Sequence, residues 1–244
     1  MYLEDYLWFL LAIVFCSIFS GIASMKVHSS FTKNDRNWCS SGMTGYDTVR
    51  HLLRANSVHG ISIGKTRGFL TDHYHPTKGV INLSESTFAN NSVAAVAVAA
   101  HEVGHVMQKQ EGYAFYKFRS ALVPFVNFGS FLAMPLVIVG ILLTLFVETS
   151  NPDLGFYVAM VGVVLYGGAL LFALITLPVE LNASKRAKQM LAAEGILTES
   201  EIHGANEVLS AAALTYLASL LTSLVYFLRF LLYVLTIFGR RSRD

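Results

Sequence analysis

Residues 92–111 read SVAAVAVAAHEVGHVMQKQE, and the predicted fold and function of the chain depend on this stretch. Asn91 or Ser92 can cap the start of a helix, and Gly112 is a suitable stop after it. The alanines and valines between them are strong to acceptable helix formers. We therefore predict one uninterrupted helix over this stretch.

The second half of this helix contains the pattern H-E-x-x-H at residues 101–105. His101 and His105 are four residues apart, so their rings lie on one face and can occupy two neighbouring corners of a zinc tetrahedron. Glu102 is placed to act on a water molecule at the metal. The alternative is a surface helix with two ordinary histidines. We predict that His101 and His105 bind one catalytic Zn²⁺ and that Glu102 is catalytic.

The composition is that of a membrane protein. Of the 244 residues, 54% are hydrophobic and only 14% are charged, whereas soluble domains carry about 25% charged residues. The formal net charge is +2, and no run of lysine or arginine indicates a nucleic-acid partner. The lipid bilayer is therefore the predicted environment.

Hydropathy divides the chain into alternating apolar and polar segments. The prediction is a transmembrane anchor at 7–24, a cytoplasmic metallopeptidase domain at 26–118, a transmembrane hairpin at 121–147 and 155–177, a cytoplasmic helical segment at 178–207, and a C-terminal membrane segment at 208–238. Acidic Glu4 and Asp5 precede the first segment, whereas a cleaved signal peptide begins with basic residues, so we expect an uncleaved anchor. The last segment is too long for one span and too short for a hairpin, so we expect a packed or interfacial first part and a span from about Ser219 to Phe238.

The fold predicted from these segments is a mostly α-helical integral membrane protein with about four membrane helices and a small α+β domain. In that domain we expect a helix over Thr44–Ala55 and short strands at Ile61–Ile63, Gly68–Thr71 and Gly79–Leu83, with Asp72–Pro76 as a turn. The last strand is expected to offer its edge to an extended peptide substrate.

A catalytic zinc ion needs three protein ligands and one open position. No histidine stands six residues after His105, so the third ligand must come from elsewhere. Glu180 is the best candidate, because it follows the predicted hairpin and returns to the side of the membrane that the H-E-x-x-H helix occupies. Asp153, His203 and Glu194 are the competing candidates.

The side of the membrane is predicted from the basic residues. They fall in the segments around the predicted site, at Lys26, Lys33, Arg36, Lys109, Lys117, Arg119, Lys185, Arg186 and Lys188. The positive-inside rule then predicts a multi-pass protein of the cell membrane with its active site facing the cytoplasm. Arg240, Arg241 and Arg243 conflict with four full spans, and a re-entrant last segment would remove the conflict.

Three motifs together resemble the YugP-type membrane zinc metallopeptidases. They are His101–His105, Leu70–Pro76 and Leu177–Ala187, and the similarity runs nearly end to end. That family in turn resembles HtpX and the CAAX prenyl proteases, whose third ligand is the glutamate of an E-x-x-A-D motif. Glu180 and Ala183 match this motif.

Ser184 stands where those relatives have aspartate. The resemblance therefore supports Glu180 as a ligand, and Asn182 or Ser184 is left to support the ligands by hydrogen bonding. His73 resembles a fixed position of the upstream motif. We predict that His73 stabilises the oxyanion of the reaction, with His203 as the second choice.

The predicted function is that of a membrane-embedded zinc endopeptidase that hydrolyses peptide bonds of protein or peptide substrates at the cytoplasmic surface. We expect these substrates to be membrane-associated and the role to be membrane-protein quality control. The alternative is a non-hydrolytic membrane metalloprotein or assembly partner that retains the fold. Glu102 discriminates between them, since a purely structural site does not need a base beside an open metal position. A transporter is a weaker third alternative, because the spans hold few ionisable groups.

Overall fold

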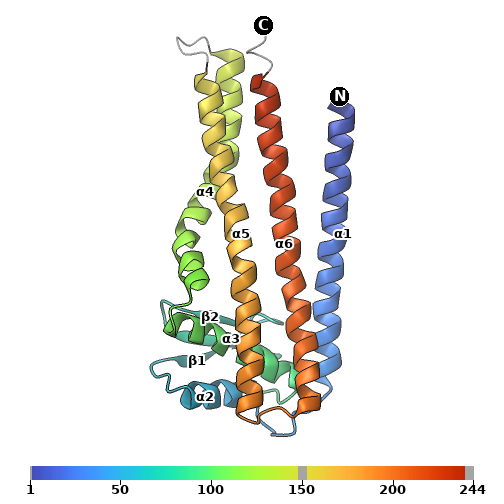
Figure 1. The fold of residues 1–244 in the computed structure, drawn as a ribbon, viewed down its shortest axis with the longest axis vertical. Coiled ribbons are helices and arrows are strands. Elements are labelled where there is room, and N and C mark those ends of the chain that lie inside the picture. Colours follow the sequence, from blue (N-terminus) through green and yellow to red (C-terminus); the bar gives the residue numbers. More distant parts are fainter. Residues whose placement is uncertain (1, 148–152, 240–244) are drawn as a thin grey trace. The chain divides into compact units, whose positions relative to one another are not determined.

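The computed structural model describes residues 2–147 and 153–239. Six helices and three strands follow one another in these residues (Figure 1). In chain order they are α1 (Tyr2–Asp35), α2 (Gly45–Ala55), β1 (Ser62–Thr66), β2 (His73–His75), β3 (Val80–Ser84), α3 (Val93–Gln110), α4 (Ala114–Phe146), α5 (Leu154–Ala193) and α6 (Glu199–Gly239).

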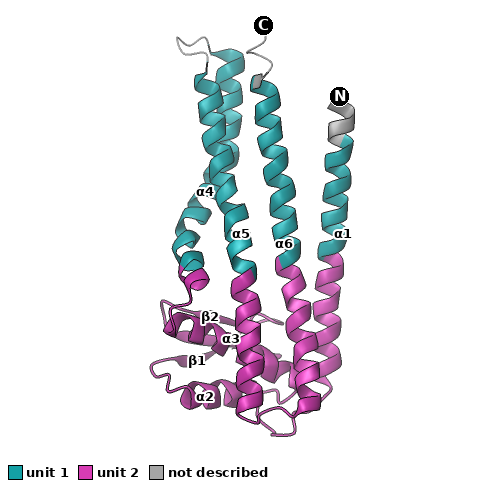
Figure 2. Ribbon diagram, in the orientation of Figure 1, with its two compact units in different colours: residues 1–20, 118–177, 217–244 teal, residues 21–117, 178–216 magenta. Residues whose placement is uncertain are grey.

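The chain divides into two compact units (Figure 2). Unit 1 comprises Met1–Ser20, Phe118–Leu177 and Leu217–Asp244, and unit 2 comprises Gly21–Lys117 and Pro178–Tyr216. Helices α1, α4, α5 and α6 each continue from one unit into the other. All the predicted metal ligands belong to unit 2.

The prediction of about four membrane helices is confirmed. Among the described residues, four helices are long and apolar enough to cross a membrane, namely α1, α4, α5 and α6. Within unit 1, α4 and α5 approach closely at glycines: a Cβ on Gly162 would lie 2.6 Å from the carbonyl oxygen of Ala133. Such small residues let membrane helices pack backbone to backbone.

The last helices differ from the expected segments. Residues 178–207 are not one element, because α5 ends at Ala193 and α6 begins at Glu199. Helix α6 then continues without interruption to Gly239, which excludes a re-entrant turn within it. Near the start of α6, Ala205 and Leu209 are buried in the core of unit 2. Arg240, Arg241 and Arg243 lie outside the described residues.

Unit 2 contains a three-stranded sheet with the order β1-β3-β2. Strand β1 is parallel to β3, and β2 is antiparallel to it. The predicted strand at Gly68–Thr71 is wrong: Gly68 and Leu70 have φ of +104° and +53°, which an extended strand does not allow. The second strand lies instead at His73–His75, inside the predicted turn.

The substrate-edge prediction for Gly79–Leu83 is also wrong. Strand β3 occupies the middle of the sheet, so its backbone groups are already paired on both sides. The edges of the sheet are β1 and β2.

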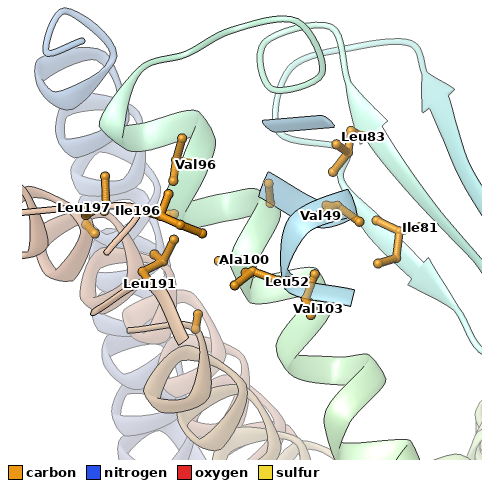
Figure 3. Close-up of a cluster of buried hydrophobic side chains, with 14 of the residues drawn as sticks. Val49, Leu52, Ile81, Leu83, Val96, Ala100, Val103, Leu191, Ile196 and Leu197 are labelled. Carbon is orange, nitrogen blue, oxygen red and sulfur yellow. The ribbon is translucent and has the colours of Figure 1, made fainter. Parts of the chain in front are cut away.

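Helix α3 forms the centre of unit 2. Its predicted bounds are confirmed, with Ser92 as N-cap and Glu111 as C-cap, and the predicted helix α2 begins with a capping box between Thr44 and Asp47. Helix α3 is buried on nearly all sides and packs against α2, the sheet and the end of α5 (Figure 3). The side chains that meet there include Val49, Leu52, Ile81, Leu83, Val96, Ala100, Val103, Leu191, Ile196 and Leu197.

Candidate metal centre

Two helices bring the three predicted ligands together. His101 and His105 lie on one face of α3 with ring centroids 4.7 Å apart. Oε2 of Glu180, on α5, is 3.2 Å from Nε2 of His101 and 3.4 Å from Nε2 of His105. Glu180 is 3% exposed, so this carboxylate is held inside the protein.

A glycine within the motif allows α5 to come this close. A Cβ on Gly104 would lie 2.6 Å from the carbonyl oxygen of Ala183 and 3.2 Å from its Cα. Gly104 is therefore in contact with the backbone of α5, one turn after Glu180. Any larger side chain at this position would push apart the two helices that carry the ligands.

The donor set fits a zinc ion. The potential ligand atoms of His101, His105 and Glu180 all lie within 4.8 Å of one another. Tetrahedral zinc with bonds of about 2.0–2.1 Å has neighbouring ligand atoms about 3.3 Å apart. The two measured N···O distances, 3.2 and 3.4 Å, are close to this value. Two imidazoles and one carboxylate also leave the fourth position of a catalytic site open.

Glu102 lies beside these ligands and is 6% exposed. Burial raises the pKa of its carboxyl from the ordinary 4.5 to about 7; His101 opposes this rise, and the carboxylates of Glu180 and Asp72 add to it. An interaction with the backbone of Tyr74, on β2, lowers the pKa of Glu102. A carboxyl group that titrates near neutral pH can both accept and return a proton.

Uncharged side chains support the two histidines. Nδ1 of His101 lies 3.1 Å from the hydroxyl of Ser184, one of the two predicted supporters. Nδ1 of His105 lies 3.0 Å from Oε1 of Gln108, which our sequence analysis did not identify. Asn182, the other predicted supporter, reaches His105 only through Gln108. The available signal was position, since Gln108 is three residues after His105 and thus on the same helix face.

The structure places His73 on the edge strand β2, and it is not part of the group of potential ligands. Its exposed ring is fixed at both nitrogens: Nδ1–H donates to the carbonyl of Thr71 (2.9 Å), and Nε2 accepts from the amide of Asn82 (3.0 Å). A role for His73 at the oxyanion requires Nε2 to leave Asn82 and carry a proton. That role stays a prediction.

The competing candidates for the third ligand do not join the two histidines of the motif. Glu194 pairs with His51 at 2.9 Å, and His203 lies 3.7 Å from Glu207. Asp153 belongs to unit 1. Among the described residues, the group that could hold a metal ion consists of the two histidines of the motif and Glu180.

Strand β2 is attached to α3 beside the ligands. Nζ of Lys109, on α3, donates to the carbonyl of Pro76 at 2.6 Å and lies 5.9 Å from the centre of the Tyr74 ring, and the backbone of Tyr74 interacts with Glu102. The free edge of the sheet is thus placed next to the candidate general base.

Comparisons with known proteins agree with this arrangement. Residues 8–235 match the model of a family described as "Putative neutral zinc metallopeptidase". The chain is 44% identical over 210 residues to "Putative membrane protease YugP" of Bacillus subtilis (strain 168), covering 86% of this chain and 89% of that protein. No solved structure matches the chain. The chain therefore belongs to this family of zinc metallopeptidases, and it is a membrane protein whose cofactor is zinc.

Proposed function

We propose that this protein is a membrane-embedded endopeptidase of the H-E-x-x-H plus glutamate type, which hydrolyses peptide bonds of protein substrates at the cytoplasmic surface of the membrane. The observation that carries the proposal is the buried Glu102 beside His101, His105 and Glu180. A structural metal site needs no carboxyl group of this kind next to an open position.

In the proposed reaction, His101, His105 and Glu180 hold the zinc ion. When bound there, zinc supplies Lewis acidity, which polarises the scissile carbonyl and acidifies a water molecule. Glu102 accepts a proton from the attacking water and delivers it to the nitrogen of the leaving amine. Burial raises the pKa of Glu102, which favours retention of the proton between the two steps.

Strand β2 is the part of unit 2 best suited to receive an extended peptide. It is an edge of the sheet, and its residue Tyr74 contacts Glu102 through the backbone. A peptide that adds to this edge by main-chain hydrogen bonds would run past the general base. Main-chain recognition favours unfolded segments, which agrees with damaged or unassembled membrane proteins as substrates.

The distribution of basic residues supports a multi-pass topology with the metal centre on the cytoplasmic side. Unit 2 carries most of these residues, among them Lys26, Lys109 and Lys188.

A paired measurement on Glu102→Gln tests the proposal. Wild-type protein and variant are purified in detergent, bound zinc is quantified, and the cleavage of an unfolded protein is followed. We expect equal zinc content and the loss of cleavage in the variant. Glu85→Gln is the matched control, because Glu85 is an exposed loop residue and its replacement should change neither quantity. Equal cleavage by Glu102→Gln would exclude this residue as the base.

The second candidate, a non-hydrolytic metalloprotein that keeps the fold, predicts a different result. Zinc would then be bound by the wild type and both variants, and none of the three would cleave unfolded soluble or membrane proteins.

A further inference from the structure

Gln108 is an unusual residue for the core of unit 2. It is large, polar and fully buried, and it lies where α3 meets α5. Its Oε1 is 3.0 Å from Nδ1 of His105, while its Nε2 donates to the carbonyl of Val179 at 2.7 Å and to Oδ1 of Asn182 at 3.0 Å. One amide therefore joins a ligand on α3 to the backbone next to Glu180 on α5.

Arg186, at one end of this series of hydrogen bonds, determines which atoms donate and which accept. Arg186 can only donate, and its Nε lies 2.8 Å from Oδ1 of Asn182. The oxygen of Asn182 thus faces Arg186, so the atom of Gln108 that approaches the same oxygen must be its NH₂ group. The carbonyl oxygen of Gln108 is left to face His105, whose Nδ1 must then carry the proton.

This order of donors has a consequence for the metal. A neutral histidine with its proton on Nδ1 presents a lone pair on Nε2. Nε2 of His105 is the atom that lies 3.4 Å from Glu180. We call the series of hydrogen bonds from Arg186 through Asn182 and Gln108 to His105 the relay. The relay places the lone pair of His105 on Nε2, the nitrogen that must bind the ion.

We propose that Gln108 is a positioning residue of the metal centre, which holds His105 in the Nδ1–H tautomer, and that Arg186 fixes the orientation of Gln108 through Asn182. The proposal rests on the proposed role of His105 as a ligand. It does not depend on whether the site cleaves peptides.

The far end of the relay is itself anchored. Arg186 forms an ion pair with Glu111, the C-cap of α3, at 2.7 Å. The relay thus begins and ends on α3 and passes through α5. It contains no carboxylate in contact with a metal ligand, whereas carboxylates often fill this position in zinc sites.

The first test is Gln108→Met, which keeps the volume of the side chain and removes the amide. Zinc affinity is measured by competition with a chelator, with every variant in the Glu102→Gln background so that cleavage plays no part. Thermal unfolding of the metal-free protein checks the fold. We expect a 10- to 100-fold weaker affinity, roughly the loss typical for a direct supporter of a ligand. Wild-type affinity in a folded Gln108→Met would overturn the proposal.

The second test is Arg186→Met, which changes a residue that does not touch a ligand. We expect a loss of about 3- to 10-fold, smaller because the effect passes through two further side chains. Lys185→Met is the matched control: it removes the same charge from the neighbouring, exposed position of α5 and should leave the affinity unchanged. Equal affinities of Arg186→Met and Lys185→Met would overturn the relay, including the case in which Gln108→Met does not fold.

The double variant distinguishes a relay from two independent structural effects. If Arg186 acts through Gln108, then Arg186→Met should have no further effect on zinc affinity once Gln108 is methionine. A double loss equal to the product of the two single losses would show that the residues act separately, against the proposal.

Discussion

Gly104→Ala is the sharpest test of how the two helices that carry the proposed ligands, α3 and α5, are held together. The new Cβ would lie 2.6 Å from the carbonyl oxygen of Ala183. Ordinary contacts between carbon and a carbonyl oxygen begin at about 3.4 Å, so the helices must separate by about 0.8 Å. Ala183 is three residues after Glu180 and on the same face of α5, so the displacement carries the carboxylate away from the histidines.

The size of this displacement decides the outcome for the metal. The N···O distances of 3.2 and 3.4 Å would grow toward 4 Å, whereas zinc ligands tolerate errors of about 0.2 Å. Glu180 could then no longer bind the ion together with both His101 and His105. We expect zinc affinity to fall by about 100-fold or more, beyond the usual effect of a lost supporting residue.

Stability should respond much less than metal binding. Overpacking costs about 1–3 kcal/mol, and alanine in place of glycine in a helix returns about 1 kcal/mol. The metal-free protein should thus lose at most about 2 kcal/mol in thermal or denaturant unfolding. Gly21→Ala is the control, since a Cβ at Gly21 of α1 meets nothing within 4 Å. Wild-type zinc affinity in Gly104→Ala would refute the argument that this contact sets the ligand spacing.

Three further substitutions separate metal binding, catalysis and folding. Ser184→Ala removes the hydroxyl at Nδ1 of His101 and should weaken zinc binding by about 10-fold, as measured by chelator competition. His73→Ala tests the predicted oxyanion donor: kcat should fall about 100-fold at unchanged zinc content, and an unchanged kcat would remove His73 from the mechanism. Thr44→Ala removes the N-cap of α2 and should cost about 1 kcal/mol in the free energy of unfolding, with zinc affinity unaltered.

The parts of unit 2 that could be predicted from the sequence are those with local causes. Helix α3 begins and ends where its caps indicate, because a cap acts within a few residues of the helix end. Strand β2 was missed because its causes are distant. It exists through pairing with β3 and through the Asp72 carboxylate, which accepts hydrogen bonds from the backbone and the hydroxyl of Ser84.

The residues of the candidate site also divide into those with local causes and those with distant causes. The two histidines and Glu102 follow from the spacing of one motif on one helix. Glu180 could be predicted only by following the chain through two apolar spans and back. Gln108 shares a helix face with His105, but its role could not be predicted from that position alone, because the atoms that fix its orientation belong to Val179 and Asn182, on another helix.

The absence of charge in Ser184 and Gln108 agrees with the charge balance of the centre. With zinc bound and both carboxyl groups ionised, two positive charges would face two buried negative charges, on Glu180 and Glu102, so the formal charges would cancel. An aspartate at position 184 would add a third negative charge to a site where burial already raises the pKa of Glu102. Because unpaired buried charge is costly, the hydroxyl and the amide can orient the imidazoles while leaving this balance intact.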